Sequence, residues 1–238
     1  MPIDVEVVVE LLAIGLFTGF IAGLLGIGGG GILVPFLSAL MIGHGVAASL
    51  AVKIGIATSL SIIVFTSLSS TRGHQKQKNV RWDVFLVMAP GIVIGDLLAS
   101  MGLSAVLKGT VLAAIFAAFL LVTATRMALN RRPREGNHLP GRAGLFGAGG
   151  VIGFVSGLLG IGGGSLSVPF LSYCNIGIHR AVGTSAALGF PIAAAGTIGY
   201  ILAGRHATGL PPHSFGYIWL PGLLIVAAGT VSMAPIGA

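Results

Sequence analysis

The residues best suited to chemistry form a short basic-and-hydroxyl pattern that occurs once in each half of the chain. The segment 53–60 reads KIGIATSL and the segment 179–186 reads HRAVGTSA, so a basic residue precedes a Thr-Ser pair by four or five positions in both. Hydroxyls donate compact hydrogen bonds and basic side chains supply positive charge, which together suit a small anion. The candidate anion-binding side chains are Lys53, Thr58, Ser59, His179, Arg180, Thr184 and Ser185.

Each of these residues also has an alternative structural interpretation. A Thr or Ser hydroxyl in a membrane helix can bond back to the preceding turn, and a Lys or Arg can extend its charge to the membrane interface. On a helix, Arg180 and Thr184 are one turn apart and share a face. The occurrence of the same pattern in both halves favours binding over the structural alternative. Asp96, the one acid clearly within a later apolar segment, is either a proton-coupling group or a pairing partner near a helix end.

A glycine-rich stretch also occurs twice in the chain. Residues 19–38 read GFIAGLLGIGGGGILVPFLS and residues 153–172 read GFVSGLLGIGGGSLSVPFLS, identical at 15 of 20 positions and 134 residues apart. The upstream glycines recur every four residues, which lets helix backbones pack closely. They are Gly15, Gly19 and Gly23 in the first half and Gly149, Gly153 and Gly157 in the second.

The denser glycines that follow predict a break in each helix. Four or more glycines within six residues disfavour a helix, and Pro35 and Pro169 come seven residues after Gly28 and Gly162. Unwound backbone at membrane depth is tolerated where it is buried in protein or lines a watery cavity, and its N–H groups can face an anion. Packing alone remains the alternative. The substrate-binding glycines predicted here are Gly28, Gly29, Gly30, Gly162, Gly163 and Gly164.

A dinucleotide-binding interpretation of the same glycines fails. Gly26, Gly28 and Gly31 spell G-x-G-x-x-G, but no strand pattern precedes them. No Asp or Glu occurs between Glu10 and Asp83, so the acid that would bind the ribose is missing. No nucleotide cofactor is therefore expected.

The composition is that of an integral membrane protein. Of 238 residues, 55% are hydrophobic and 8% are charged, and the mean hydropathy is +1.00. A soluble domain carries about a quarter charged residues, and a membrane-spanning helix needs about 20 apolar residues. The N-terminal MPIDVEVVVELLAIGLF is acidic, unlike a signal peptide, so 7–25 is expected to be a retained span. One cysteine and six histidines without ligand spacing predict no disulfide, metal or other cofactor.

The net charge of +7 is concentrated in two short loops rather than spread as a nucleic-acid-binding surface. Nine of the 13 basic residues lie within 72–81 and 126–142. The positive-inside rule places both loops in the cytoplasm, and the acidic N-terminus outside. The chain is therefore expected to be a multi-pass protein of the cytoplasmic (inner) membrane, with the lipid bilayer as a partner and no nucleic acid.

The apolar segments predict an all-α polytopic bundle of two homologous repeats with glycine-broken or re-entrant segments. The first transmembrane repeat is 1–127, a basic cytoplasmic linker follows at 128–142, and the second repeat is 143–238. Five crossings in the first repeat would invert the second, a common plan for secondary transporters. Whether 32–43 and 166–176 span or re-enter is open. The fifth apolar segment of the first repeat has no counterpart in the second repeat before Ala238. Whether the chain continues past Ala238 and whether it forms a homo-oligomer are therefore open. The apolar segments lie at 7–25, 32–43, 46–70, 84–101 and 105–127, then at 143–160, 166–176, 180–203 and 217–238.

These motifs together resemble the sulfite exporter TauE/SafE family over nearly the whole chain. The resemblance is carried by GLLGIGGG-x-x-x-V-P-F-L in both halves, ATSL at 57–60, FTSLSS at 65–70, KNVRW at 78–82 and AVGTS at 181–185. It implies a permease for sulfite, sulfonates or related sulfur-containing anions, usually working outward. Members of that family typically carry a final helix in the second half.

The sequence therefore predicts a secondary transporter that moves a small sulfur-containing anion by alternating access. The alternative from another class is a channel or facilitator for a different small solute or ion. A membrane enzyme is disfavoured, because no nucleophile–His–acid set occurs within the apolar segments. The sequence does not identify the anion, the direction of transport or the coupling ion.

Overall fold

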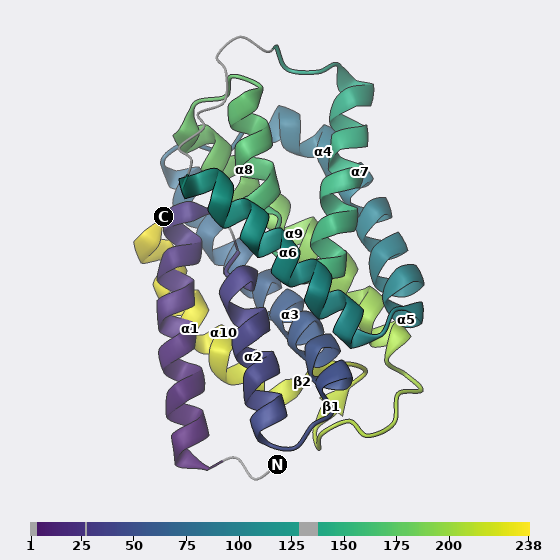
Figure 1. Cartoon of the computed structure of the whole chain (residues 1–238). Coiled ribbons are helices and arrows are strands. Elements are labelled where there is room, and N and C mark those ends of the chain that lie inside the picture. The colour runs from purple at the N-terminus through teal and green to yellow at the C-terminus, as the bar shows by residue number, and fades with distance from the viewer. Residues whose placement is uncertain (1–3, 27, 129–137) are drawn as a thin grey trace.

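The computed structural model describes residues 4–26, 28–128 and 138–238 of the chain, and most of these residues are helical (Figure 1). The elements are α1 Val5–Leu25, α2 Gly30–Gly43, α3 Ala48–Lys76, α4 Trp82–Leu97, the π-helix η1 Leu98–Leu103, α5 Ser104–Val106, α6 Gly109–Ala128, α7 Arg142–Leu159, α8 Gly164–Tyr173, α9 Ile178–Ala203, β1 Ser214–Phe215, β2 Ile218–Trp219 and α10 Leu220–Gly237.

The predicted all-α membrane architecture is confirmed. Within the described residues, six helices are long and apolar enough to cross a bilayer: α1, α3, α4 with η1, α7, α9 and α10. The two strands, of two residues each, pair as one antiparallel hairpin between α9 and α10. The chain is thus a multi-pass membrane protein whose fold is set by helix packing.

The predicted glycine breaks are also present. α1 ends at Gly26, and Gly28 and Gly29 follow with φ of +72° and +78°. α7 ends at Gly160, and Gly163 has φ of +69°. A side chain at these positions would strain the left-handed backbone, which is why glycine stands there. Each break separates a long helix from a short one.

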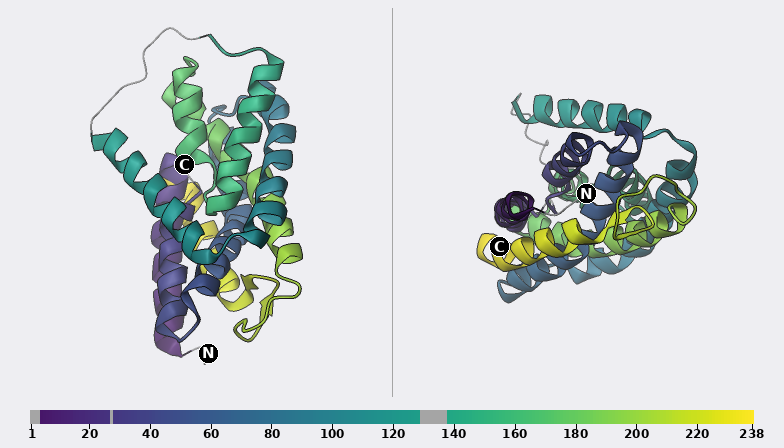
Figure 2. Two further views of the ribbon diagram at one scale, coloured as in Figure 1. Left: turned by 45° about the vertical axis from the view of Figure 1, so that its right-hand side comes forward. Right: turned by 90° about the horizontal axis from the view of Figure 1, so that it is seen from below.

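The short helices after the breaks are half-spans. α2 has 14 residues and α8 has 10, so they are about 21 Å and 15 Å long, against about 30 Å of hydrocarbon. In Figures 1 and 2, α1 and α2 form a hairpin whose open end lies at the lower end of the molecule, whereas α7 and α8 open at the upper end. The segments predicted at 32–43 and 166–176 therefore turn back from the middle of the molecule.

The two halves of the chain are interlocked rather than side by side. α3 and α9 pack against each other at the centre, α1 of the first half packs along α10 of the second, and α7 of the second packs along α4 of the first. α2 lies on α3, and α8 lies on α9. Every long helix except α6 thus has an extensive contact with a helix of the other half.

The glycines spaced by four residues provide this close packing, as predicted. A Cβ atom added at Gly19 would lie 2.6 Å from the Cα of Thr230 in α10. One added at Gly153 would lie 2.7 Å from the Cα of Ile92 in α4. Such distances are below any real Cβ contact, so these glycines are required for the backbones to touch.

The ends of the molecule carry different loops. The turn from α3 to α4 and the start of α7 lie at the upper end in Figure 1, and the start of α1 and the β1–β2 hairpin lie at the lower end. The described residues of both predicted cytoplasmic loops are therefore on one side. Most of the predicted linker, 129–137 of 128–142, lies outside the described residues.

Candidate functional site

The two glycine breaks meet at the centre of the molecule. A Cβ atom added at Gly28 would lie 2.8 Å from the Cα of Gly162. One added at Gly30 would overlap the carbonyl oxygen of Gly160. The unwound segment of one half therefore lies directly on that of the other, with no side chain between them.

A small cavity of about 10 Å³ lies beside this contact. Its wall contains glycines from both breaks and three hydroxyl residues from α3, none of them charged. The residues around it are Ala22, Gly26, Gly28, Thr66, Ser67, Ser70, Gly162, Ala186 and Gly189.

The hydroxyls of the cavity differ in how they are bonded. Thr66 donates to the carbonyl oxygen of Ile62 at 3.1 Å, and Ser67 donates to that of Val64 at 3.1 Å. Ser70 is 2% exposed, and its hydroxyl has no hydrogen-bond partner among the described residues. Buried polar groups in proteins normally have a hydrogen-bond partner, either in the protein or in ordered water, so this hydroxyl has a free bonding position. Ser70 is thus the hydroxyl on the cavity that is available to a guest molecule.

The predicted serines hold the breaks rather than line the cavity. Ser59 donates a hydrogen bond of 3.2 Å to the carbonyl oxygen of Gly160, and Ser185 donates one of 3.2 Å to the carbonyl oxygen of Gly26. Both serines are fully buried. Each half therefore supplies the donor that satisfies the last carbonyl before the break in the other half.

The predicted threonines make an equivalent pair of contacts with loops. The hydroxyl of Thr58 accepts the backbone N–H of Trp219 at 3.0 Å, and that of Thr184 accepts the backbone N–H of Arg81 at 3.0 Å. Arg81 and Trp219 directly precede α4 and α10, respectively. The threonines thus fix the starts of the helices that follow α3 and α9.

The remaining predicted glycines lie at the helix starts. Gly29 and Gly163 are the residues before α2 and α8, and Gly30 and Gly164 are the first residues of those helices. Gly163 packs against Ile192, and the hydroxyl of the nearby Ser167 has no partner among the described residues. The helix N-termini therefore begin at the central contact.

The predicted basic residues are separated from this centre and from one another. Lys53 lies near the start of α3, and its Nζ is 5.6 Å from the centroid of the Tyr217 ring, a cation–π contact. His179 and Arg180 are exposed at the start of α9, at the upper end of the molecule. The structure does not bring these three side chains together.

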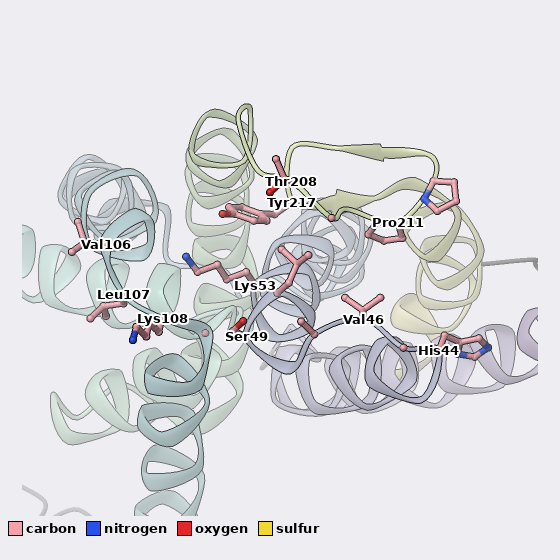
Figure 3. A pocket seen from close by; sticks show the side chains of 16 residues that line it. His44, Val46, Ser49, Lys53, Val106, Leu107, Lys108, Thr208, Pro211 and Tyr217 are labelled. Carbon is pink, nitrogen blue, oxygen red and sulfur yellow. The ribbon is translucent and has the colours of Figure 1, made fainter.

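Lys53 instead lines a larger cavity at the lower end. This cavity has a volume of about 750 Å³, and Figure 3 shows Lys53, Lys108 and Tyr217 around it. His44 stands on the opposite rim. Burial raises the pKa of the Tyr217 phenol, so this ring is neutral at ordinary pH. We call this space the outer cavity, because it lies opposite the basic loops; its wall carries positive charge from both lysines.

The set of predicted site residues and the wall of the central cavity share two glycines. Of the predicted residues, Gly28 and Gly162 line the central cavity, whereas the hydroxyl residues Thr66, Ser67 and Ser70 that also line it were not among the predicted ones. Their signal was present in the run FTSLSS at 65–70, which places four hydroxyl residues within about two turns of an apolar helix.

Comparison with known proteins agrees with this architecture. The sequence profile described as sulfite exporter TauE/SafE matches residues 11–238. A probable membrane transporter protein of Haemophilus influenzae is 34% identical over 229 residues, covering 95% of this chain and 86% of the relative. A probable membrane transporter protein of Methanocaldococcus jannaschii is 27% identical over 228 residues, covering 95% and 84%. No solved structure matches the chain significantly. The chain belongs to the sulfite exporter TauE/SafE family of membrane transporters.

Proposed function

We propose that this protein is a secondary transporter that exports a small sulfur-containing anion, such as sulfite or a sulfonate, across the cytoplasmic membrane. The observation that carries the proposal is the contact of the two glycine breaks, Gly28 against Gly162, beside a cavity with an unpartnered hydroxyl at Ser70. Backbone N–H groups at helix starts and neutral hydroxyls suit a dehydrated oxyanion. The family's name supports the choice of sulfite as the first substrate to test.

The size of the cavity supports alternating access. A space of about 10 Å³ holds about one water molecule, so an anion requires the two halves to separate at the breaks. The interlocked hairpins, α1–α2 opening at one end and α7–α8 at the other, support two inverted repeats, 1–127 and 143–238, as the moving parts. Opening at the lower end would join the central cavity to the outer cavity.

The candidate residues then have different roles in the proposal. The glycines at the two breaks and Ser70, with Thr66 and Ser67, surround the anion. Thr58, Ser59, Thr184 and Ser185 position the breaks and the adjoining helices. Lys53 raises the local anion concentration in the outer cavity, and His179 and Arg180 do so at the cytoplasmic end. We propose no catalytic residue and no resident cofactor.

The test is exchange of radiolabelled sulfite by the full chain in proteoliposomes, with a small sulfonate and sulfate as competitors. Saturable exchange in the wild type is expected, with a loss of apparent affinity in Ser70→Ala. Ser61→Ala is the matched control, because Ser61 lies on the same helix outside the cavity wall, where its hydroxyl bonds to the Ala57 carbonyl at 2.9 Å and to the Thr197 hydroxyl at 3.4 Å. No uptake of any of the three anions contradicts the proposal, and fast conductance that does not saturate identifies a channel instead.

A further inference from the structure

Asp96 is a fully buried carboxylic acid in the last turn of α4. It does not line the central cavity, so the proposed anion site leaves it without a function. Its side chain is 0% exposed, and neither carboxyl oxygen has a hydrogen-bond partner among the described residues. The hydroxyl of Ser100 donates to the backbone carbonyl of Asp96 at 2.8 Å rather than to the carboxyl group. The side chain is therefore isolated from water and from local donors.

Glycines of two other helices make the room for this carboxyl group. A Cβ atom added at Gly196 of α9 would lie 2.9 Å from Oδ1 of Asp96, and one added at Gly157 of α7 would overlap the carboxyl group. Leu60 of α3 lies against Gly196 as well. The acid is thus enclosed by glycine backbone and an apolar side chain, where α4 packs against α7 and α9.

No cation faces Asp96 from the packed helices in the part of the chain that the structure describes. The one charged side chain of α7 is Arg142, about four turns away at its start. In α9, His179 and Arg180 lie at the start of the helix, and its nearer titratable group is Tyr200, a neighbour of Asp96. In α3, the side chain of Lys53 is held over the ring of Tyr217. The remaining charged or titratable groups of these helices are Asp83 at the start of α4 and, in the last two turns of α3, Arg72, His74 and Lys76.

This environment decides the protonation state. An ionised carboxylate without a counter-ion or donor is strongly disfavoured in an apolar interior, whereas the neutral acid is tolerated. The second possibility for this residue, pairing with a basic group near a helix end, finds no partner in the described structure. The observed packing of α4 against α7 and α9, which we call the closed conformation, is therefore compatible with the protonated form of Asp96.

Buried polar side chains follow Asp96 along the chain toward the outer cavity. Asp96, Ser100 and Ser104 follow one another by four residues and are all 0% exposed, across the π-helix η1. Tyr200 is a neighbour of Asp96, and its ring stacks edge-on against that of Tyr217 with centroids 6.4 Å apart. Tyr217 lines the outer cavity. Irregular π turns of this kind occur frequently at functional sites.

We propose that Asp96 is the proton-carrying residue that couples anion transport to the proton gradient, exchanging its proton with the outer cavity by way of Tyr200. The neutral acid allows α4 to close against α7 and α9, and release of the proton requires these helices to separate and admit water. This inference rests on the proposed transport function, but the protonation of Asp96 can be tested without a substrate.

The first measurement is infrared spectroscopy of the purified full chain at neutral pH. A protonated carboxyl band is expected in the wild type and in Asp83→Asn, and its loss is expected in Asp96→Asn. Asp83 is the matched control, because it is an exposed acid on the same helix, paired with Arg81. A wild-type band that persists unchanged in Asp96→Asn overturns the proposal whether or not sulfite is transported.

The second measurement separates coupling from transport in proteoliposomes. Sulfite exchange at equal pH is expected in the wild type and in Asp96→Asn, whereas accumulation driven by an imposed pH gradient is expected only in the wild type and in Asp83→Asn. Gradient-driven accumulation that survives in Asp96→Asn overturns the inference. Absence of all exchange in the wild type contradicts sulfite transport, and the infrared result then decides the protonation of Asp96 alone.

A second variant guards against a folding defect in Asp96→Asn. Tyr200→Phe keeps the buried ring and removes the hydroxyl, which donates to the carbonyl oxygen of Leu158 at 3.5 Å. We expect it to retain the protonated band and the exchange of sulfite but to respond more slowly to the pH gradient. An unchanged response excludes the route through Tyr200.

Discussion

The hydroxyl of Ser59 in α3 donates a hydrogen bond of 3.2 Å to the carbonyl oxygen of Gly160, the residue that ends α7 in the other half of the chain. The same contact occurs with the halves exchanged, from Ser185 to Gly26. Each break is thus stabilised by a donor more than 100 positions away. Because the two donors lie on α3 and α9, the geometry of both breaks depends on how these two central helices pack against each other.

Removal of one such donor is expected to destabilise the protein. Ser59→Ala leaves the buried carbonyl of Gly160 without this hydrogen bond, which costs about 1–3 kcal/mol. Thermal unfolding in detergent measures the effect. Thr125→Ala is the control, because Thr125 is exposed and bonds to its own helix, and equal stability of the two variants would contradict the role of Ser59.

A side chain at the meeting of the breaks is expected to abolish transport. Gly28→Ala adds a Cβ atom 2.8 Å from the Cα of Gly162, at a residue whose φ is +72°. Both effects displace the backbone that we propose surrounds the anion. Gly43→Ala is the control in the adjoining helix, since nothing lies within 4 Å of its added Cβ. Sulfite exchange by both variants checks this prediction. Equal rates would contradict a role in transport and would indicate that the break glycines serve packing alone.

The glycines between α7 and α4 are expected to matter for stability. Gly153→Ala forces α7 away from Ile92 and should cost about 1–3 kcal/mol, as overpacking of a core does. Gly147→Ala on the same helix has open space around its Cβ and should be neutral or slightly stabilising, because alanine favours helix. Unfolding midpoints of the two variants, compared with the wild type, test the difference.

The outer cavity is expected to attract anions through its lysines. Lys53→Gln removes a partly exposed charge worth about 0.5–1 kcal/mol, so the apparent KM for sulfite on that side should rise about two- to fivefold. High salt should reduce the difference by screening the charge. Lys76→Gln, at the opposite end of the same helix, should leave this KM unchanged when substrate is added on the outer side. A KM unaffected by Lys53→Gln would exclude an electrostatic role of the outer cavity.

Properties that depend on composition and local backbone geometry were readable from the sequence. The excess of apolar residues requires a membrane. The glycine runs after Gly26 and Gly160 favour breaks, because glycine is a poor helix former and adopts φ near +70° without steric cost. The spacing of Gly153 and its neighbours by four residues likewise determines which face of α7 packs closely.

The use of each polar side chain was decided only by tertiary structure. Ser59 and Ser70 lie on the same helix and are both buried hydroxyls, yet one donates to a break of the other half and one faces the central cavity. Likewise, the sequence placed Asp96 within a span but left its partner open. The sequence alone thus determined a membrane protein with two broken, glycine-packed repeats. The roles of its hydroxyls and of Asp96 came from the fold, because they depend on contacts between segments far apart in the chain.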